Sequence, residues 1–174
     1  MPIEWRTTMI LRPYKDVDAK YISKWITDEK AFYQWSAGRM GEYPLTEEKL
    51  INHYGEQKDN TDFCVFCACD DEGKVVGQLI MRYTDADRSH VRFGFIIVDT
   101  GIRGKGYGKQ MLNLAKEYAF NMLKAKRITL GVFENNPKAM YCYEAVGFKA
   151  TDKIDTYSIN GEEWKCIDME CVRE

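Results

Sequence analysis

The feature that most constrains the fold is a change of hydrophobic period across a glycine-rich turn. Val91–Val98 is rich in β-branched and aromatic residues, which predicts a buried strand. Tyr107–Lys124 instead carries apolar residues at helical spacing, which predicts an amphipathic helix packed on a sheet. The turn between them, Arg103–Lys109, alternates glycines with basic residues. A buried strand that passes through a short turn into a helix of this kind indicates an α/β fold.

The other elements follow from the same kind of pattern. We expect strands at 9–13, 63–70, 75–84 and 128–133, and helices at 17–26, 46–57 and 138–146, with Asp16, Thr46 and Asn136 as their caps. Residues 149–157 and 164–172 form a closing hairpin around Asn160-Gly161, and residues 31–43 are expected to be irregular. No repeat or linker divides the chain. The expectation is therefore one domain, 1–174, with a mixed sheet in one layer covered by helices.

Composition argues against several classes of function. The chain has 174 residues and a formal net charge of −2, whereas nucleic-acid-binding domains are usually basic. No apolar run approaches the roughly 18 residues of a membrane span, and the first eleven residues do not resemble a signal peptide. We therefore expect a cytoplasmic protein with neither a nucleic-acid nor a membrane partner. The sequence does not decide between a monomer and a homodimer.

Half of the six cysteines lie together, which raises the question of a metal site. Cys64, Cys67 and Cys69 fall in a predicted strand, where Cys64 and Cys67 point to opposite faces. A zinc site needs about four ligands, usually from two closely spaced pairs, and no second pair is present. The expectation is free thiols and no metal.

The glycine-rich turn has the features of an anion site. Glycines permit positive φ and close backbone approach, and the free N–H groups at a helix start attract negative charge. Basic residues in the turn, Arg103, Lys105 and Lys109, add to this. The spacing fails the dinucleotide fingerprint, which requires glycine at Lys109, and fails the P-loop, which requires Ser or Thr at Gln110. Two interpretations of this turn are left: it binds a phosphate-bearing ligand of another kind, or it is a tight strand-to-helix turn with no ligand.

Two motifs together resemble the GNAT superfamily of N-acetyltransferases. Arg103-x-x-Gly106-x-Gly108 matches the family's Gln/Arg-x-x-Gly-x-Gly/Ala signature. About 30 residues later, Asn136–Phe148 matches the Asn-x-x-Ala…Tyr-x-x-x-Gly-Phe hallmark. The opening Leu11-Arg12-Pro13 and the ending Ile167–Glu170 are similar to the branch that contains ribosomal-protein alanine and polyamine acetyltransferases.

This resemblance implies a fold and a cosubstrate. The expected sheet is mostly antiparallel, has about seven strands, is splayed centrally, and is flanked by about four helices. Acetyl-CoA would lie in the splay, its pantetheine arm pairing with the backbone of Ile96–Val98 and its pyrophosphate on the glycine turn. The cofactor-binding residues implied are Ile97, Val98, Arg103, Gly104, Lys105, Gly106, Tyr107, Gly108, Lys109, Asn136 and Lys138. Asn136 would contact the pantetheine arm or order its turn.

The implied reaction is acetyl transfer to a primary amine through a ternary complex. The backbone N–H near Ile96 would stabilise the carbonyl oxygen, and Tyr143 would protonate the departing thiolate as general acid. Many relatives carry a Glu base where this chain has Arg92, which cannot act as a base. Glu134 is then the first candidate base, with His90 or a water chain as alternatives.

The segment between the first two predicted helices is expected to line the acceptor pocket. It holds the aromatics Phe32, Tyr33, Trp35 and Tyr43 near the acids Asp28, Glu29 and Glu42, a combination that suits an ammonium group. A protein N-terminus, a polyamine or another small amine all fit, and Arg92 could instead recognise the carboxylate of an amino-acid-like acceptor. A non-catalytic acyl-CoA sensor or scaffold is the main alternative function, and a nucleotide-binding regulatory domain is a third.

Overall fold

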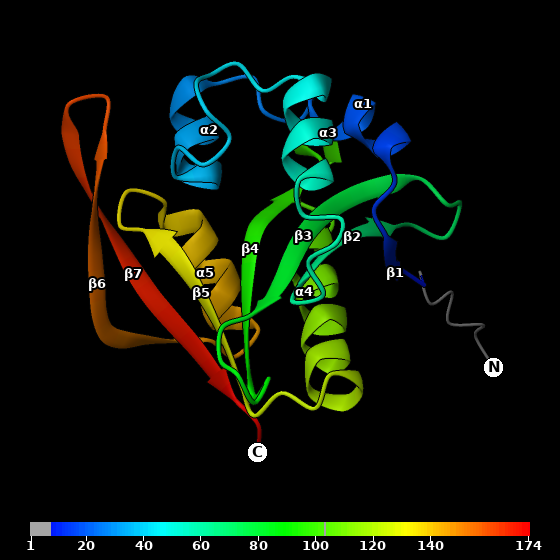
Figure 1. Cartoon of the computed structure of the whole chain (residues 1–174), viewed down its shortest axis with the longest axis vertical. Coiled ribbons are helices and arrows are strands. Elements are labelled where there is room, and N and C mark those ends of the chain that lie inside the picture. The colour runs from blue at the N-terminus through cyan, green and yellow to red at the C-terminus, as the bar shows by residue number, and fades with distance from the viewer. Residues whose placement is uncertain (1–7, 103) are drawn as a thin grey trace.

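The computed structural model describes residues 8–102 and 104–174, and its centre is a seven-stranded sheet with the order β1-β2-β3-β4-β5-β7-β6 (Figure 1). Neighbouring strands are antiparallel except β4 and β5, which are parallel, so the predicted mixed, mostly antiparallel sheet is confirmed. The strands are β1 (Ile10–Pro13), β2 (Phe63–Cys69), β3 (Val75–Tyr83), β4 (His90–Val98), β5 (Arg127–Phe133), β6 (Lys149–Ile159) and β7 (Glu162–Val172).

Helices cover both faces of this sheet. They are α1 (Ala19–Ile22), α2 (Glu29–Ser36), α3 (Glu47–Gly55), α4 (Tyr107–Glu117) and α5 (Pro137–Ala145), with α4 continuing as a π-helical turn, Tyr118–Met122. Apolar residues of α4 and α5 pack against one face, while α1, α2 and α3, at the top of Figure 1, pack against the other. The protein thus has two hydrophobic cores, one on each face of the sheet.

The structure corrects the sequence prediction at two helices near the N-terminus. The helix expected over 17–26 is only α1, preceded by a 3₁₀ turn, and Asp16 does not cap it. The Asp18 carboxylate instead accepts from the Lys15 N–H at 2.8 Å and pairs with Arg12 at 2.8 Å. Residues 31–43 are not all irregular, because α2 begins after Asp28, whose carboxylate accepts from the Ala31 N–H at 2.8 Å.

The central splay lies between β4 and β5. In the part of the chain that the structure describes, these strands pair only at His90, Val91 and Arg92, with Arg127, Ile128 and Thr129 as the partners. On its other edge β4 continues to pair with β3 as far as Val98. The β5-facing edge of residues 93–98 consequently has no strand partner, and its backbone polar groups are left for something else to bind.

A bulge in β4 lies just beyond the splay point. The β3–β4 register shifts between Gln78 and Ile80, and Phe95 adopts a φ of 46°, unusual for a residue with a side chain. The buried Gln78 amide donates to the Phe95 carbonyl at 3.2 Å and accepts from the Tyr54 hydroxyl at 2.9 Å. Buried hydrogen bonds thus fix the bulge and set the direction of the backbone that follows, from Ile96 onward.

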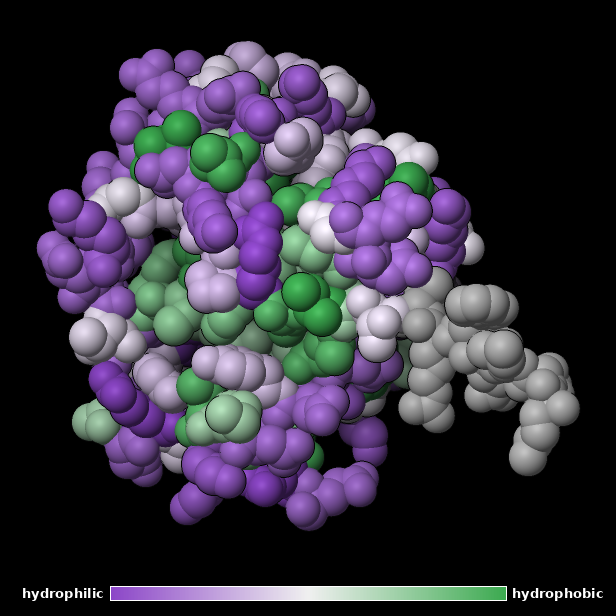
Figure 2. Space-filling view, turned by 90° about the vertical axis from the view of Figure 1, so that its right-hand side faces the viewer, coloured by the Kyte–Doolittle hydropathy of each residue, from purple (hydrophilic) through white to green (hydrophobic). Residues whose placement is uncertain are grey.

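Figure 2, which shows the side that β1 and α1 occupy in Figure 1, has apolar residues gathered in the middle of the face and hydrophilic residues around them. None of the described helices is long and apolar enough to cross a membrane. All six cysteines are free thiols, and Cys67 and Cys69 are buried in β2 while Cys64 is exposed.

Candidate active site

The glycine turn places the amino end of α4 beside the gap between β4 and β5. Gly104 and Gly106 have φ values of 86° and 72°, and Gly106 is the N-cap of α4 without any side-chain cap. A Cβ on Gly108 would lie 3.5 Å from the Cys142 sulfur and 3.7 Å from a methyl of Val98, so the first turn of α4 lies close to both α5 and the end of β4. The uncapped N–H groups of the first turn face this junction with the positive end of the helix dipole.

The charged residues of this turn are accessible. Lys105 and Lys109 are exposed, and Tyr107, the first residue of α4, is half-buried. Arg103, which the sequence analysis included, lies outside the described residues. Backbone amides flanked by solvated lysines can bind an anion without a buried charge.

A second helix start lies close by, at α5. The Asn136 carboxamide oxygen accepts from the Ala139 N–H at 3.5 Å, and Pro137 occupies the first turn, as predicted. Of the two roles expected for Asn136, the ordering of the turn is the one seen here. Lys138, which follows, is exposed. The helices α4 and α5 contact each other, and the first turn of α4, at Gly108, lies against Cys142 of α5 and Val98 of β4.

Tyr143 lies on the buried side of α5. Its ring packs edge-on against Phe148, with 6.4 Å between the centroids. Burial raises the pKa of the Tyr143 phenol above its usual value, and the nearby thiols of Cys142 and Cys166 raise it further. Its hydroxyl makes no hydrogen bond within the described residues. The phenol is therefore a protonated donor at neutral pH.

The two side chains considered as bases have different surroundings. Glu134 follows the end of β5, is exposed, and has a backbone N–H that donates to the Lys165 carbonyl at 2.9 Å. His90 instead has both ring nitrogens engaged, with Thr84 at 2.5 Å and Thr129 at 2.6 Å. Burial lowers the His90 pKa, so its imidazole is neutral at neutral pH but has no free nitrogen. The assignment of a base stays a prediction.

A pocket opens where β4 leaves β5, on the face that α2 covers. Figure 1 shows α2 lying over this end of the sheet, and Gln34 of α2 donates to the Asn135 carbonyl at 3.1 Å, which ties the helix to the turn before α5. The pocket is lined mainly by polar or aromatic side chains and glycines, namely Gln34, Trp35, Arg39, Arg82, Arg92, Gly94, Phe95, Gly131, Phe133, Tyr157 and Cys166. It is the hollow best placed to hold an acceptor amine beside the splay.

The expected composition of this pocket is only partly present. Trp35 lines it, but Phe32 and Tyr33 are core residues, and the Tyr43 hydroxyl donates to the Thr27 carbonyl at 2.8 Å. The acids are elsewhere, because Asp28 caps α2 and both Glu29 and Glu42 are exposed. Arg82 and the buried pair Gln78–Tyr54 were not identified from the sequence, since their place depends on strand register and a bulge that leave no local pattern.

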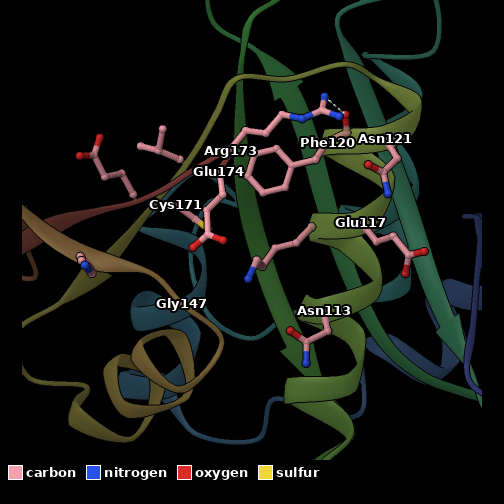
Figure 3. Close-up of a pocket in the computed structure, with 12 residues that line it drawn as sticks. Asn113, Glu117, Phe120, Asn121, Gly147, Cys171, Arg173 and Glu174 are labelled. Atoms are coloured by element: carbon pink, nitrogen blue, oxygen red, sulfur yellow. Dashed lines mark hydrogen bonds between the residues drawn. The ribbon is translucent and has the colours of Figure 1, made fainter.

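A larger hollow of about 750 Å³ lies elsewhere, at the carboxyl end of α4 (Figure 3). It is bounded by the last turns of that helix and by the end of β7, where the Arg173 guanidinium donates to the Phe120 carbonyl at 2.7 Å. The glycine turn is at the other end of the same helix, so this hollow is not part of the site.

Known proteins resemble the chain along most of its length. The acetyltransferase (GNAT) family matches residues 22–148. A spermine/spermidine N(1)-acetyltransferase of Bacillus subtilis (strain 168) is 33% identical over 97 residues, which are 53% of this chain and 62% of that relative. The chain thus matches somewhat less than two thirds of that protein. The spermidine N(1)-acetyltransferase of Escherichia coli (strain K12) is 24% identical over 164 residues, covering 93% of this chain and 84% of the relative.

Solved structures agree in fold. The crystal structure of a spermidine N-acetyltransferase from Vibrio cholerae, in complex with CoA and spermine, superimposes with a TM-score of 0.79 at 22% identity. The superposition covers 94% of this chain and 95% of the other. Because the family match spans well over half of the sequence and includes both the glycine turn and the start of α5, the chain belongs to the GNAT family of acetyltransferases.

Proposed function

We propose that this protein is an N-acetyltransferase that moves an acetyl group from acetyl-CoA to a primary amine in a ternary complex. The observation that carries the proposal is the open edge of β4 beside the uncapped amino end of α4. An amide-rich pantetheine arm can pair with an unpaired strand edge, and a pyrophosphate suits the helix start. No other described part of the chain places these two features together.

The residues that would hold acetyl-CoA follow from this placement. The backbone of Ile96, Ile97 and Val98 would pair with the pantetheine arm. The amides from Gly104 to Lys109 would bind the pyrophosphate, with Lys105, Lys109, Lys138 and Arg103 supplying charge near it. Asn136 would act by holding the start of α5 in place, as its bond to the Ala139 N–H supports.

The chemistry needs three contributions from the chain. The N–H of Ile96, aimed by the bulge, would donate to the thioester carbonyl oxygen as charge develops there. The neutral amine forms the new C–N bond as the C–S bond breaks, and Tyr143 would give its proton to the leaving thiolate. The nitrogen would lose its proton to Glu134 or to water, and the same proton, carried on through solvent to the tyrosinate, would restore the phenol. Holding both reactants together supplies much of the rate.

The acceptor class is a small-molecule or peptide amine. The relatives named above are named for spermidine and spermine, which are small amines, and the pocket beside the splay gives an acceptor amine a place next to the open edge of β4. A non-catalytic acyl-CoA sensor is the alternative, favoured by Arg92 in the position where many relatives carry a glutamate base. The two differ in whether any amine releases free coenzyme A.

The test is release of free coenzyme A from acetyl-CoA in the presence of amines, followed with a thiol reagent. We expect amine-dependent release that is reduced in Tyr143→Phe and unchanged in Tyr141→Phe, a matched control on the same helix whose side chain is 70% exposed. Binding of acetyl-CoA, measured by calorimetry, without release for any amine of a broad panel would contradict the enzyme and support the sensor.

A further inference from the structure

The pocket beside the splay has an unusual charge. Among its described lining residues there is no aspartate or glutamate, and there are three arginines, Arg39, Arg82 and Arg92. A pocket that bound a polyamine would be expected to offer carboxylates to several ammonium groups. The side chains here offer the opposite charge.

Two of these arginines are forced together by the sheet. Arg82 of β3 and Arg92 of β4 are direct partners in the antiparallel register, so their side chains leave the same face side by side. Like charges in that relation destabilise a sheet. Burial lowers the pKa of Arg82, and the neighbouring charges of Arg92 and Arg39 lower it further, which reports that the three groups lie within one another's field.

Only one of the three has a counter-ion. The Arg92 guanidinium donates to the Asp168 carboxylate at 2.7 Å and to the Thr129 hydroxyl at 3.1 Å. Arg82 and Arg39 make no ion pair or side-chain hydrogen bond within residues 8–102 and 104–174, whereas each of the other described arginines has an acceptor: Arg12, Arg88, Arg127 and Arg173. Asp155, the register partner of the lining residue Cys166, is 3.9 Å from Lys153 and does not itself line the pocket.

Gly131 of β5 lies directly against the Arg92 guanidinium. A Cβ there would lie 3.0 Å from an Arg92 guanidinium nitrogen and 2.8 Å from the Cys166 sulfur. The absence of a side chain therefore lets the Arg92 guanidinium lie across β5 to reach Asp168 of β7. Arg92 is held in this position, which leaves Arg82 half-buried beside it with unused donors.

We infer that the acceptor amine carries a carboxylate, and that Arg82, with Arg39 at the pocket rim, binds this carboxylate while the amine faces the splay. This inference rests on the proposed acetyl transfer. A guanidinium presents parallel N–H groups that match the two oxygens of a carboxylate. An amino-acid-like acceptor would thus supply the missing counter-ion, and a polyamine, with several positive charges, would be repelled.

The same charges would also help the chemistry. Positive groups near an ammonium favour its neutral form, which is the form that attacks the thioester. This pocket would therefore lower the acceptor's amine pKa without a carboxylate base. Arg92 then has a use in the position where a glutamate is common: it orders the cationic face through Asp168 and Thr129.

The test compares each acceptor with its own uncharged analogue. Free α-amino acids, their carboxamides, spermidine, and short peptides with a free amine and a side-chain carboxylate are assayed with acetyl-CoA. We expect kcat/KM at least about tenfold higher for an acid than for its carboxamide, although the carboxamide has the more readily deprotonated amine. The relative rates of free amino acids and peptides tell which source of the carboxylate the pocket takes.

Variants identify the residue responsible. Arg82→Gln should lower kcat/KM for the acids about tenfold or more, mainly through KM. The carboxamides should lose less, because they lose only the positive charge that favours the neutral amine and not a bound carboxylate. Arg82→Lys should restore part of the loss, because a point charge remains without the paired donors. Arg88→Gln is the control, since Arg88 pairs with Asp62 on the surface outside the pocket.

Failure of this inference and failure of the proposed function give different results. Turnover of spermidine or of carboxamides at rates equal to or above those of the acids would overturn the carboxylate site and keep the transferase. An absence of turnover for every amine, with calorimetric binding of an acid that is lost in Arg82→Gln, would overturn the transferase and keep the carboxylate site. Loss of both turnover and binding would overturn both.

Discussion

The glycine turn before α4 and the pocket under α2 are built in different ways. The turn consists of backbone: positive φ at Gly104 and Gly106 and uncapped amides beyond them. The pocket consists of side chains that reach it from separate strands, among them Arg82 of β3 and Arg92 of β4. The backbone site would bind the pyrophosphate of the cosubstrate, which is the same whatever the acceptor. The side chains of the pocket would instead determine which acceptor binds. We expect changes in the turn to alter acetyl-CoA affinity and changes in the pocket to alter acceptor choice.

The largest expected effect is at Tyr143, which lies between these two regions. Tyr143→Phe removes the proton donor and keeps the ring packed against Phe148. Turnover should fall about 100-fold, the usual scale for loss of a general acid. Acetyl-CoA affinity should change less than about twofold, because the phenol acts on the leaving thiolate and not on the bound cosubstrate. Steady-state kinetics and calorimetry together separate these quantities.

Tyr141→Phe is the matched control for that variant. It removes a phenol from the same helix, where the side chain is exposed, and should leave turnover unchanged. An equal loss in both variants would indicate a general disturbance of α5, and full activity in Tyr143→Phe would remove Tyr143 from the mechanism.

The next largest effect tests the rigidity of the pocket. Asp168→Asn removes the charge paired with Arg92, where the two side chains are 6% and 21% exposed. An unpaired, largely buried guanidinium should lower the free energy of unfolding by about 2 kcal/mol. Asp62→Asn removes a pair whose side chains are 53% and 52% exposed and should cost well under about 1 kcal/mol. Urea titration of both variants measures the difference, and similar losses would mean that Asp168 does not order the pocket.

The contrast also explains which parts could be predicted from the sequence. Glycines before a helix, Asn136 before Pro137 and the β-branched run of β4 are local patterns, and the structure places each as expected. The helix α2 was not predicted although its polar and apolar faces and its Asp28 cap are present in the sequence, because its eight residues, Glu29–Ser36, give only about two turns in which to recognise a helical period. Arg82 and Arg92 meet through strand register, and the bulge at Phe95 depends on the distant Gln78, so no stretch of sequence marks either. The features that could not be predicted are the contacts between residues far apart in the sequence.

A smaller effect separates backbone strain from ligand binding at the turn. Gly106→Ala and Gly73→Ala both place a Cβ at positive φ, 72° and 82°, with little or nothing within 4 Å. Each should lose about 1 kcal/mol of stability from strain. Only Gly106→Ala should also weaken acetyl-CoA binding, by about tenfold, because its turn must relax away from the helix start to relieve that strain. Calorimetry decides, and equal affinities in the two variants would exclude the turn as the pyrophosphate site.

The smallest expected effect is a gain in stability, whereas the changes at Asp168 and Gly106 cause a loss. Arg82→Met keeps much of the side chain's apolar length and removes a half-buried charge that lies beside Arg92 without a partner. The free energy of unfolding should rise by about 0.5 kcal/mol, because like charges across a strand pair are destabilising. The matched Arg127→Met removes an arginine that has a partner, Glu170 at 2.7 Å, and should not stabilise. A gain in stability combined with a loss of activity toward carboxylate-bearing acceptors would show that Arg82 lowers the stability of the fold but is needed for acceptor binding.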